Sequence, residues 1–246
     1  MPKRSLLFDT HCHIDLFPDP KGLIDEIERA GVYTIAVTNT PSVFSHMASF
    51  AEGSKYVRAA LGLHPELAFQ RKGELSLMWD LMGETRYIGE VGLDYTTTNP
   101  HDREAQRRIF EQVIARCDES GDKIITIHSR RAAEDVVEII GTSFRGIAIL
   151  HWYSGSIRIL KKAVSNGCYF SINPAMIRSK RFEQLLAAIP QDRILTETDG
   201  PFVKLGKNPA KPWDTEEVIN KLAVLWQLPT EAVLSMIFNN FKSVLG

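Results

Sequence analysis

Cysteine is scarce in this chain of 246 residues. The three cysteines are far apart and odd in number, which argues against a framework of disulfide bonds: Cys12, Cys117 and Cys168. A continuous apolar run of about 18–20 residues, which a membrane-spanning helix needs, is also missing. The apolar stretch between Arg4 and Asp9 is too short for the core of a signal peptide. We therefore expect a cytoplasmic protein in a reducing environment.

An excess of charge of either sign is absent as well. Lys plus Arg number 29 and Asp plus Glu number 30, so the net charge is −1. This balance argues against a protein whose whole surface binds nucleic acid or an anionic membrane, although it allows a local basic patch. With 44% hydrophobic and 24% charged residues, the composition is that of a soluble globular protein. No linker-like stretch divides the chain, and we expect a single domain covering residues 1–246.

Apolar, β-branched segments alternate with amphipathic segments along the chain. The segments expected to form strands are Leu6–Thr10, Tyr33–Thr38, Val57–Leu63, Tyr87–Val91, Ile124–His128, Ile147–His151, Cys168–Ile172 and Ile194–Thr198. The segments expected to form helices are Leu23–Ala30, Glu74–Met82, Glu104–Glu119, Ala133–Ile140, Ile157–Ser165, Phe182–Ala188, Thr215–Trp226 and Thr230–Asn240. This alternation predicts a parallel sheet covered by helices.

The number of strands separates two architectures of this α/β class. Eight strand–helix units in about 250 residues predict a TIM (β/α)8 barrel with extra C-terminal helices. A doubly wound open sheet is the alternative, and it usually needs fewer strands and a glycine-rich turn after the first of them. The first strand here leads into Asp9-Thr10-His11-Cys12-His13, which cannot cradle a phosphate in that way. The sequence therefore favours the barrel.

Histidines and carboxylates gather at the C-terminal ends of the expected strands. The histidines at these positions are His11, His13, His64, His128 and His151, and the carboxylates are Glu90, Asp94, Glu197 and Asp199. In a barrel all these strand ends open onto one face, where the loops build the active site. The pattern therefore predicts a metal site.

Six of these residues form the expected ligand set: His11, His13, Glu90, His128, His151 and Asp199. Residues i and i+2 of a strand point to the same side, so His11 and His13 can bind one ion. Six nitrogen and oxygen ligands are too many for one tetrahedral zinc. They suit two ions about 3.5–4 Å apart, bridged by Glu90. With no thiolate among them, Zn²⁺, Mn²⁺, Mg²⁺ and Co²⁺ all remain open.

Residues suited to an anionic substrate lie beside the expected ligands. Arg130 follows His128 by two residues, and its planar guanidinium suits a phosphate group. The segment from His151 to Ser156 leads into a helix, so its backbone N–H groups and side chains can bind an anion. The candidate substrate-binding residues are His64, Arg130, Tyr153, Ser154 and Gly155.

Six ordered motifs resemble those of the TatD-type metal-dependent deoxyribonucleases. They are Asp9-Thr10-His11-Cys12-His13, Gly62-Leu63-His64-Pro65, Gly89-Glu90-Val91-Gly92-Leu93-Asp94-Tyr95, His128-Ser129-Arg130, His151-Trp152-Tyr153-Ser154-Gly155 and Thr196-Glu197-Thr198-Asp199-Gly200-Pro201. The resemblance implies a TIM barrel that hydrolyses DNA phosphodiester bonds with divalent metals. It implies the same six metal ligands, with Glu90 bridging, and places Glu197 and His64 beside the ligands or the substrate.

A narrower set of segments resembles QatD, the TatD-type group of the Qat anti-phage defence systems. These segments are Pro65-Glu66-Leu67-Ala68, Ser129-Arg130-Arg131-Ala132, His151-Trp152-Tyr153-Ser154-Gly155-Ser156, Pro174-Ala175-Met176 and Pro212-Trp213-Asp214. This resemblance implies protein partners encoded in a defence operon. The chain departs from common TatD patterns at Glu66, where a histidine often stands, and in the loop at residues 96–99.

The expected reaction is two-metal hydrolysis of a phosphodiester, with catalytic Glu90, Asp199 and Glu197. Asp199 would accept the proton of the nucleophile and Glu197 would assist it. We expect DNA single strands or ends as substrate, because a barrel rim admits them more easily than the middle of a duplex. One alternative is an amide or ester hydrolase on the same barrel, for example an aminoacyl-tRNA deacylase. Another is a subunit that mainly binds partners in a defence complex.

Overall fold

The computed structural model describes residues 6–246, and its contacts divide the chain into two compact units. The first unit comprises residues up to 36, 47–58 and 171–246, and the second comprises residues 37–46 and 59–170. The boundaries fall within β2 (Tyr33–Val37), α2 (Pro41–Phe50), β3 (Val57–Ala60) and β7 (Tyr169–Ile172). That the whole chain is a single domain stays a prediction.

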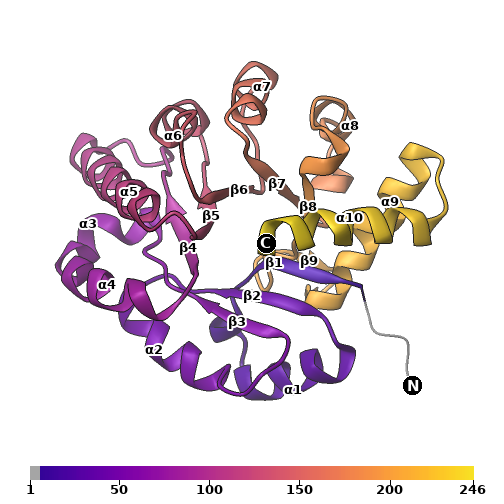
Figure 1. The fold of residues 1–246 in the computed structure, drawn as a ribbon, viewed down its shortest axis with the longest axis horizontal. Helices are drawn as coiled ribbons and strands as arrows, with labels where there is room; N and C mark the ends of the chain where they lie inside the picture. Colours follow the sequence, from indigo (N-terminus) through magenta and orange to yellow (C-terminus); the bar gives the residue numbers. More distant parts are fainter. Residues whose placement is uncertain (1–5) are drawn as a thin grey trace. The chain divides into compact units, whose positions relative to one another are not determined.

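The second unit is built on parallel strands that follow one another in the chain: β4 (Tyr87–Gly92), β5 (Ile124–His128) and β6 (Ile147–His151). Tyr87 pairs with Ile124, which pairs in turn with Ile147 on the far side of β5. The helices of this unit are α3 (Ala68–Arg71), α4 (Leu75–Leu81), α5 (Pro100–Ser120), α6 (Ala133–Ile140) and α7 (Ile157–Ser165). Helices α5, α6 and α7 lie along the outer side of β4, β5 and β6 (Figure 1). The runs of isoleucine in β5 and β6 are buried, as in parallel strands covered by helices.

In the first unit, β1 (Phe8–Cys12) lies between β2 and β8 (Ile194–Thr196). Phe8 pairs in parallel with Tyr33 of β2, and Thr196 Oγ1 of β8 donates to the Phe8 carbonyl at 2.7 Å. The helices of this unit are α1 (Pro20–Ala30), α8 (Phe182–Leu186), α9 (Glu216–Trp226) and α10 (Thr230–Leu245), and a short hairpin is formed by β9 (Lys204–Leu205) and β10 (Asn208–Pro209). Helix α10 covers β1, because Phe241 stacks on Phe8 with ring centroids 4.2 Å apart.

Capping residues explain where two helices begin earlier than the apolar pattern indicates. Asp19 caps α1 by accepting the Gly22 N–H at 3.0 Å, and Asn99 caps α5 by accepting the His101 N–H at 3.0 Å. In both helices a proline follows the cap, where its missing N–H costs nothing. The eight expected strands are all present within a few residues of their expected bounds. Helices α2 and α3 and the hairpin were not expected.

Among residues 6–246, no single helix is long and apolar enough to cross a membrane. In the same range, only Pro212–Trp226 and Thr230–Leu245 taken together are long and apolar enough, and the chain bends by 114° between them.

Asn240 of α10 connects this helix to the chain that leads into β8. It is 7% exposed, and its Nδ2 donates to the carbonyls of Gln191 at 2.7 Å and Ile194 at 2.9 Å. Asn240→Ala leaves these carbonyls without their donor, so we expect a loss of about 2 kcal/mol of unfolding free energy. Calorimetry should show a melting temperature lower by about 6 °C. The exposed neighbour Asn239 is the matched control, and equal melting temperatures for Asn239→Ala and Asn240→Ala would contradict this role.

Candidate metal centre

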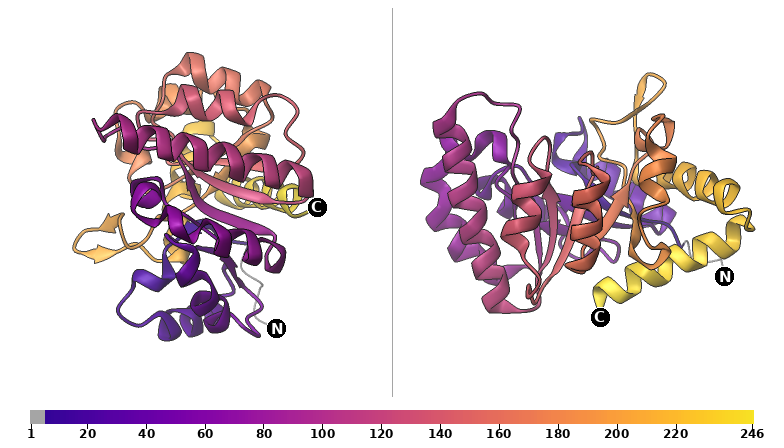
Figure 2. Two further views of the ribbon diagram at one scale, coloured as in Figure 1. Left: turned by 90° about the vertical axis from the view of Figure 1, so that its left-hand side faces the viewer. Right: turned by 90° about the horizontal axis from the view of Figure 1, so that it is seen from above.

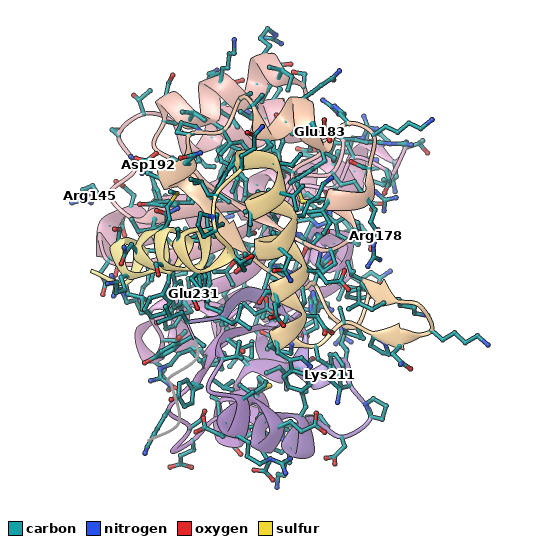
Figure 3. All side chains as sticks on the ribbon, turned by 90° about the vertical axis from the view of Figure 1, so that its right-hand side faces the viewer. Arg145, Arg178, Glu183, Asp192, Lys211 and Glu231 are labelled. Carbon is teal, nitrogen blue, oxygen red and sulfur yellow. The ribbon has the colours of Figure 1, made fainter. Side chains whose placement is uncertain are left out.

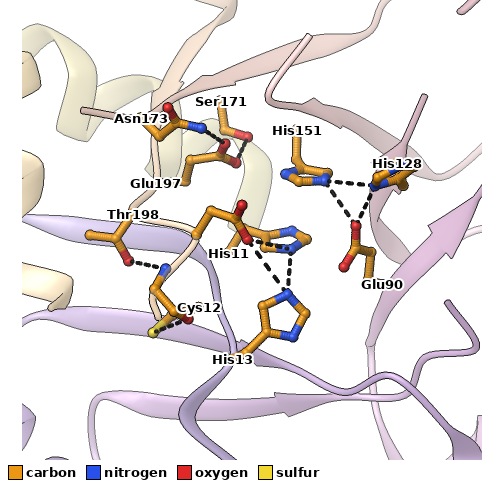
Figure 4. Close-up of polar contacts among 12 residues, drawn as sticks. His11, Cys12, His13, Glu90, His128, His151, Ser171, Asn173, Glu197 and Thr198 are labelled. Atoms are coloured by element: carbon orange, nitrogen blue, oxygen red, sulfur yellow. Dashed lines mark hydrogen bonds and ion pairs between the residues drawn. The ribbon is translucent and has the colours of Figure 1, made fainter. Parts of the chain in front are cut away.

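His11, His13 and Asp199 form a compact group of ligand atoms in the first unit. The two Nε2 atoms are 3.3 Å apart (Figure 4). Asp199 Oδ1 lies 3.7 Å from Nε2 of His11 and 3.5 Å from Nε2 of His13. Ligands about 2.1 Å from a tetrahedral ion are themselves about 3.4 Å apart, so this group fits one divalent metal ion. The structure thus brings together three of the six expected ligands.

Backbone hydrogen bonds between β1 and the loop after β8 fix this group. The His11 carbonyl accepts from Asp199 N and the Gly200 carbonyl accepts from His13 N, both at 2.8 Å. Asp199 has a φ of 52°, which is uncommon for a residue other than glycine. The sequence predicts that His11 and His13 lie on the same strand. In the structure β1 ends at Cys12, so His13 lies just beyond it. The group therefore depends on the long-range bonds more than on strand periodicity.

Asp9 also holds the loop after β8 in place through hydrogen bonds. Its Oδ1 accepts the N–H groups of His11 and Thr198, both at 3.0 Å, and its Oδ2 accepts from the Thr198 hydroxyl. Burial raises the pKa of Asp9 well above its usual value, although these hydrogen bonds act in the opposite direction. Asp9 is thus a structural part of the site rather than a surface carboxylate.

Glu90 is the centre of a second group, in the second unit. Its Oε1 is 2.7 Å from His128 Nδ1, 2.9 Å from His151 Nε2 and 3.4 Å from His64 Nε2. Figure 4 shows the contacts to His128 and His151. His64 Nδ1 accepts the Glu66 N–H at 3.2 Å, so the free nitrogen of His64 is the one facing Glu90. Ligand atoms of His64, Glu90 and His128 lie close enough to hold one ion, so His64 is a further candidate ligand, and its role at the substrate stays a prediction.

Close packing of strands positions Glu90. Its N–H donates to the Thr38 carbonyl at 3.0 Å. A Cβ on Gly62 would lie 1.8 Å from that carbonyl oxygen and 2.5 Å from Glu90 N, so no side chain fits there. The glycine before Leu63 in the sequence motif thus allows the backbone of β4 to approach.

Asp94 orients His128 and is the residue whose role the sequence did not reveal. Its Oδ2 is 2.8 Å from His128 Nε2, and its Oδ1 accepts from Thr96 N at 2.8 Å and Thr96 Oγ1 at 2.5 Å. Burial alone would raise the pKa of Asp94, but the hydrogen bonds from His128 and Thr96 outweigh it and hold the pKa well below its usual value. This contact leaves Nδ1 of His128 for Glu90 or a metal. The sequence feature that could have indicated this role is that Asp94 follows Glu90 by four residues in the same motif.

Hydrogen bonds with Asp94 and Glu90 also affect the pKa of His128. Burial alone would lower the pKa of His128, but these bonds outweigh it, and the pKa is raised. A metal ion at Nδ1 therefore has to compete with a proton there.

Glu197 lies in the interior of the first unit and is fully buried. Its Oε2 accepts from the Ser171 hydroxyl and its Oε1 from Asn173 Nδ2 at 3.0 Å (Figure 4). Both carboxylate oxygens are thus occupied by side chains of this unit. The predicted catalytic role of Glu197 stays a prediction.

The other expected substrate-binding residues differ in exposure. Arg130 and Ser154 are exposed and Gly155 is partly exposed, as a surface contact with substrate requires. Tyr153 is 2% exposed, its hydroxyl donates to the Ser156 carbonyl at 2.8 Å, and its ring packs edge-on against Phe170. The substrate-binding role of Tyr153 stays a prediction that this placement does not support.

Two groups of nitrogen and oxygen ligands at strand ends of an α/β protein define a metal-dependent hydrolase. Residues 8–246 match the family described as TatD related DNase, and the chain belongs to this family. A metal-dependent hydrolase of Bacillus subtilis, YabD, is 31% identical, with 96% of this chain and 98% of the relative covered. The human deoxyribonuclease TATDN3 is 24% identical, with 95% and 92% covered.

Solved structures of TatD proteins show the same fold. The crystal structure of YjjV, a TatD homologue from Escherichia coli, matches 98% of both chains with a TM-score of 0.82 and 22% identity. The structure of a TatD family hydrolase from Entamoeba histolytica matches with a TM-score of 0.79 and 14% identity, over 98% of this chain and 99% of the other. These matches confirm the expected α/β fold of the TIM-barrel class with C-terminal helices.

Proposed function

We propose that this protein is a deoxyribonuclease that hydrolyses DNA phosphodiester bonds with two divalent metal ions. The observation that carries the proposal is that each unit holds its own group of histidine and carboxylate ligands. The family and the name of its human relative support DNA as the substrate. Single strands or ends are the proposed form, because a chain with a net charge of −1 has no general affinity for duplex DNA.

The chain offers nitrogen and oxygen donors for both ions. His11, His13 and Asp199 would hold one ion. Glu90, His128 and His151 would hold the other, with His64 as a further donor. That Glu90 also bridges the two ions stays a prediction. Cys12 is not a donor, because burial raises the pKa of its thiol well above the usual value. Bound divalent ions would supply Lewis acidity and lower the pKa of bound water. Zn²⁺, Mn²⁺, Mg²⁺ and Co²⁺ all fit this donor set.

The residues of the chain have distinct proposed tasks in hydrolysis. Asp199 accepts the proton of the attacking water on its second carboxylate oxygen, while its Oδ1 lies with the ligand nitrogens of His11 and His13. In the second unit, Arg130 and Ser154 follow His128 and His151 closely and are exposed, so they orient the phosphate. Glu197, held in place by Ser171 and Asn173, has the proposed task of assisting Asp199.

Asp94→Asn tests how His128 is oriented. The amide accepts a hydrogen bond from Nε2 more weakly than the carboxylate does, so we expect metal affinity in the second unit to fall about 10- to 100-fold. Titration of the metal-free protein with Co²⁺, followed by calorimetry, measures this. Asp102→Asn is the matched control, since Asp102, in the first turn of α5, accepts from the Thr97 hydroxyl at 3.0 Å instead of holding a histidine. Equal affinities in both variants would contradict the role of Asp94.

The proposed activity is tested with purified, metal-loaded protein and end-labelled single- and double-stranded DNA. RNA, aminoacyl-tRNA and a panel of amides and esters are assayed in parallel. We expect cleavage of DNA that is faster on single strands and is abolished by chelation of the metal. Activity confined to amides or esters would overturn the proposal in favour of the deacylase alternative.

We also propose, from the QatD resemblance, that the protein acts in the cytoplasm within an anti-phage defence operon together with protein partners. A plaque assay with the complete operon tests this role, with wild type compared with a Glu90→Gln strain. Equal plaque numbers in the two strains would contradict a nuclease role in defence. Loss of protection only on deletion of the whole protein would instead favour a partner-binding subunit.

A further inference from the structure

Phe202 exposes an aromatic ring beside the metal ligands of the first unit. It is 58% exposed, and its ring stands edge-on to the His13 ring, with centroids 5.0 Å apart. Its N–H donates to the Asp199 carbonyl at 2.9 Å, so the backbone that carries the ring is fixed to that of a metal ligand. An exposed aromatic ring beside metal ligands offers a surface on which a nucleic-acid base can stack.

A short cationic hairpin follows Phe202 in the chain. Strands β9 and β10 pair Leu205 with Asn208 across a two-residue turn, and Gly206 in this turn has a φ of 63°. Figure 2 shows the hairpin extending from the body of its unit. Lys204 and Lys207 are exposed, and neither makes an ion pair with any residue between 6 and 246. The hairpin therefore carries two uncompensated positive charges.

The surroundings of the hairpin hold it in place without neutralising it. Arg178 Nη1 donates to the Lys204 carbonyl at 3.3 Å, while Nη2 of the same side chain pairs with Glu217 at 2.8 Å. Lys211, beyond the hairpin, is paired with Glu26 at 2.5 Å. Figure 3 labels Arg178 and Lys211 on the side of the unit where the hairpin projects. The charges left for a partner are thus those of Lys204 and Lys207.

We propose that Phe202 and the hairpin, residues 202–209, form a binding strip for single-stranded DNA. Phe202 stacks on the base next to the phosphate being cleaved, and Lys204 and Lys207 contact phosphates farther along the strand. An aromatic ring followed by cations is the pattern by which proteins bind single strands without reading sequence. This inference rests on the proposed deoxyribonuclease activity, and it specifies which residues hold the DNA strand.

The test uses metal-loaded protein and a fluorescent, cleavage-resistant phosphorothioate single strand. Phe202→Ala should weaken binding about tenfold, the loss of one stacked base, with little change in salt dependence. The double variant Lys204→Gln with Lys207→Gln should reduce the slope of log K against log salt by about 1.4, because two phosphate contacts are lost. The matched controls in the same unit are Val224→Ala, which is 72% exposed, and Lys55→Gln with Lys242→Gln. These controls should bind as wild type does.

Hydrolysis of single-stranded DNA is compared with that of bis(4-nitrophenyl) phosphate, a diester too small to reach the hairpin. In the double lysine variant, the ratio of DNA to small-diester hydrolysis should fall about tenfold, through KM. Wild-type protein that cleaves neither substrate would overturn the proposed function. Wild-type cleavage of DNA with unchanged binding by Phe202→Ala would overturn the strip alone, as would tighter binding of polyglutamate than of DNA.

Discussion

Glu90→Gln is expected to reduce the rate of metal-dependent DNA cleavage about a thousandfold, or by about 4 kcal/mol of transition-state stabilisation. The carboxylate Oε1 of Glu90 lies within 3.4 Å of nitrogens of His64, His128 and His151. An amide oxygen has nearly the same shape but no charge, so it would bind a divalent ion far more weakly. The loss of activity is measured as the cleavage rate on an end-labelled single strand. The loss of metal binding is measured as the metal content of the purified protein.

Glu119→Gln is the control for Glu90→Gln, because Glu119 is exposed near the end of α5 in the same unit. It should cleave DNA and retain metal as wild type does. If Glu90→Gln kept more than a tenth of the wild-type rate, the group around Glu90 would not be the reaction centre. Equal cleavage by both variants and by chelated protein would point to a contaminating nuclease.

Gly92→Ala is expected to lower the free energy of unfolding by about 3 kcal/mol and the melting temperature by about 10 °C. Gly92 has a φ of 139°, which residues with a side chain rarely adopt. A Cβ there would lie 2.1 Å from the carbonyl oxygen of His128, so β4 and β5 would have to separate. The change would also displace Glu90 and His128, and thermal unfolding and metal content should both report it.

Variants of two further glycines in the same unit distinguish the cost of a positive φ from the cost of the steric clash with the His128 carbonyl. Gly121 has a φ of 76° and open space around its Cβ position, so Gly121→Ala should cost about 1 kcal/mol from backbone strain alone. Gly73 has open space and no positive φ, so Gly73→Ala should leave the melting temperature almost unchanged. If Gly92→Ala and Gly121→Ala melted at the same temperature, the steric clash with the His128 carbonyl would not explain the loss of stability in Gly92→Ala.

Local sequence pattern was sufficient for the strands and for most helix bounds. Strands β5 and β6 and helices α6 and α7 have the expected bounds, because long apolar or amphipathic runs end at clear polar residues. Helices α1 and α5 begin earlier than expected, since Pro20 and Pro100 at their first turns do not contribute to an apolar pattern. Hairpin β9–β10 is too short to show any periodicity.

The site was predictable only as a set of residue types at strand ends. The six expected ligands lie in two groups, one in each unit, and His64 adds to the second. The sequence predicts Tyr153 at the substrate, whereas in the structure its ring is buried edge-on against Phe170, so that role stays a prediction without structural support. Asp94 had no assigned role, because its contact with His128 joins residues 34 positions apart. Pairing over such distances leaves no local signature.

The sequence by itself determined the α/β class, the order of the elements and the residue types available for metal binding. These follow from hydrophobic periodicity and from the rule that polar residues gather at strand ends, which act over a few residues. Only the tertiary structure decided which nitrogen of His128 is held by Asp94, why Gly62 and Gly92 carry no side chain, and that Phe202 leads into a cationic hairpin. The reason is physical, since these features arise where segments distant in the chain come within bonding distance.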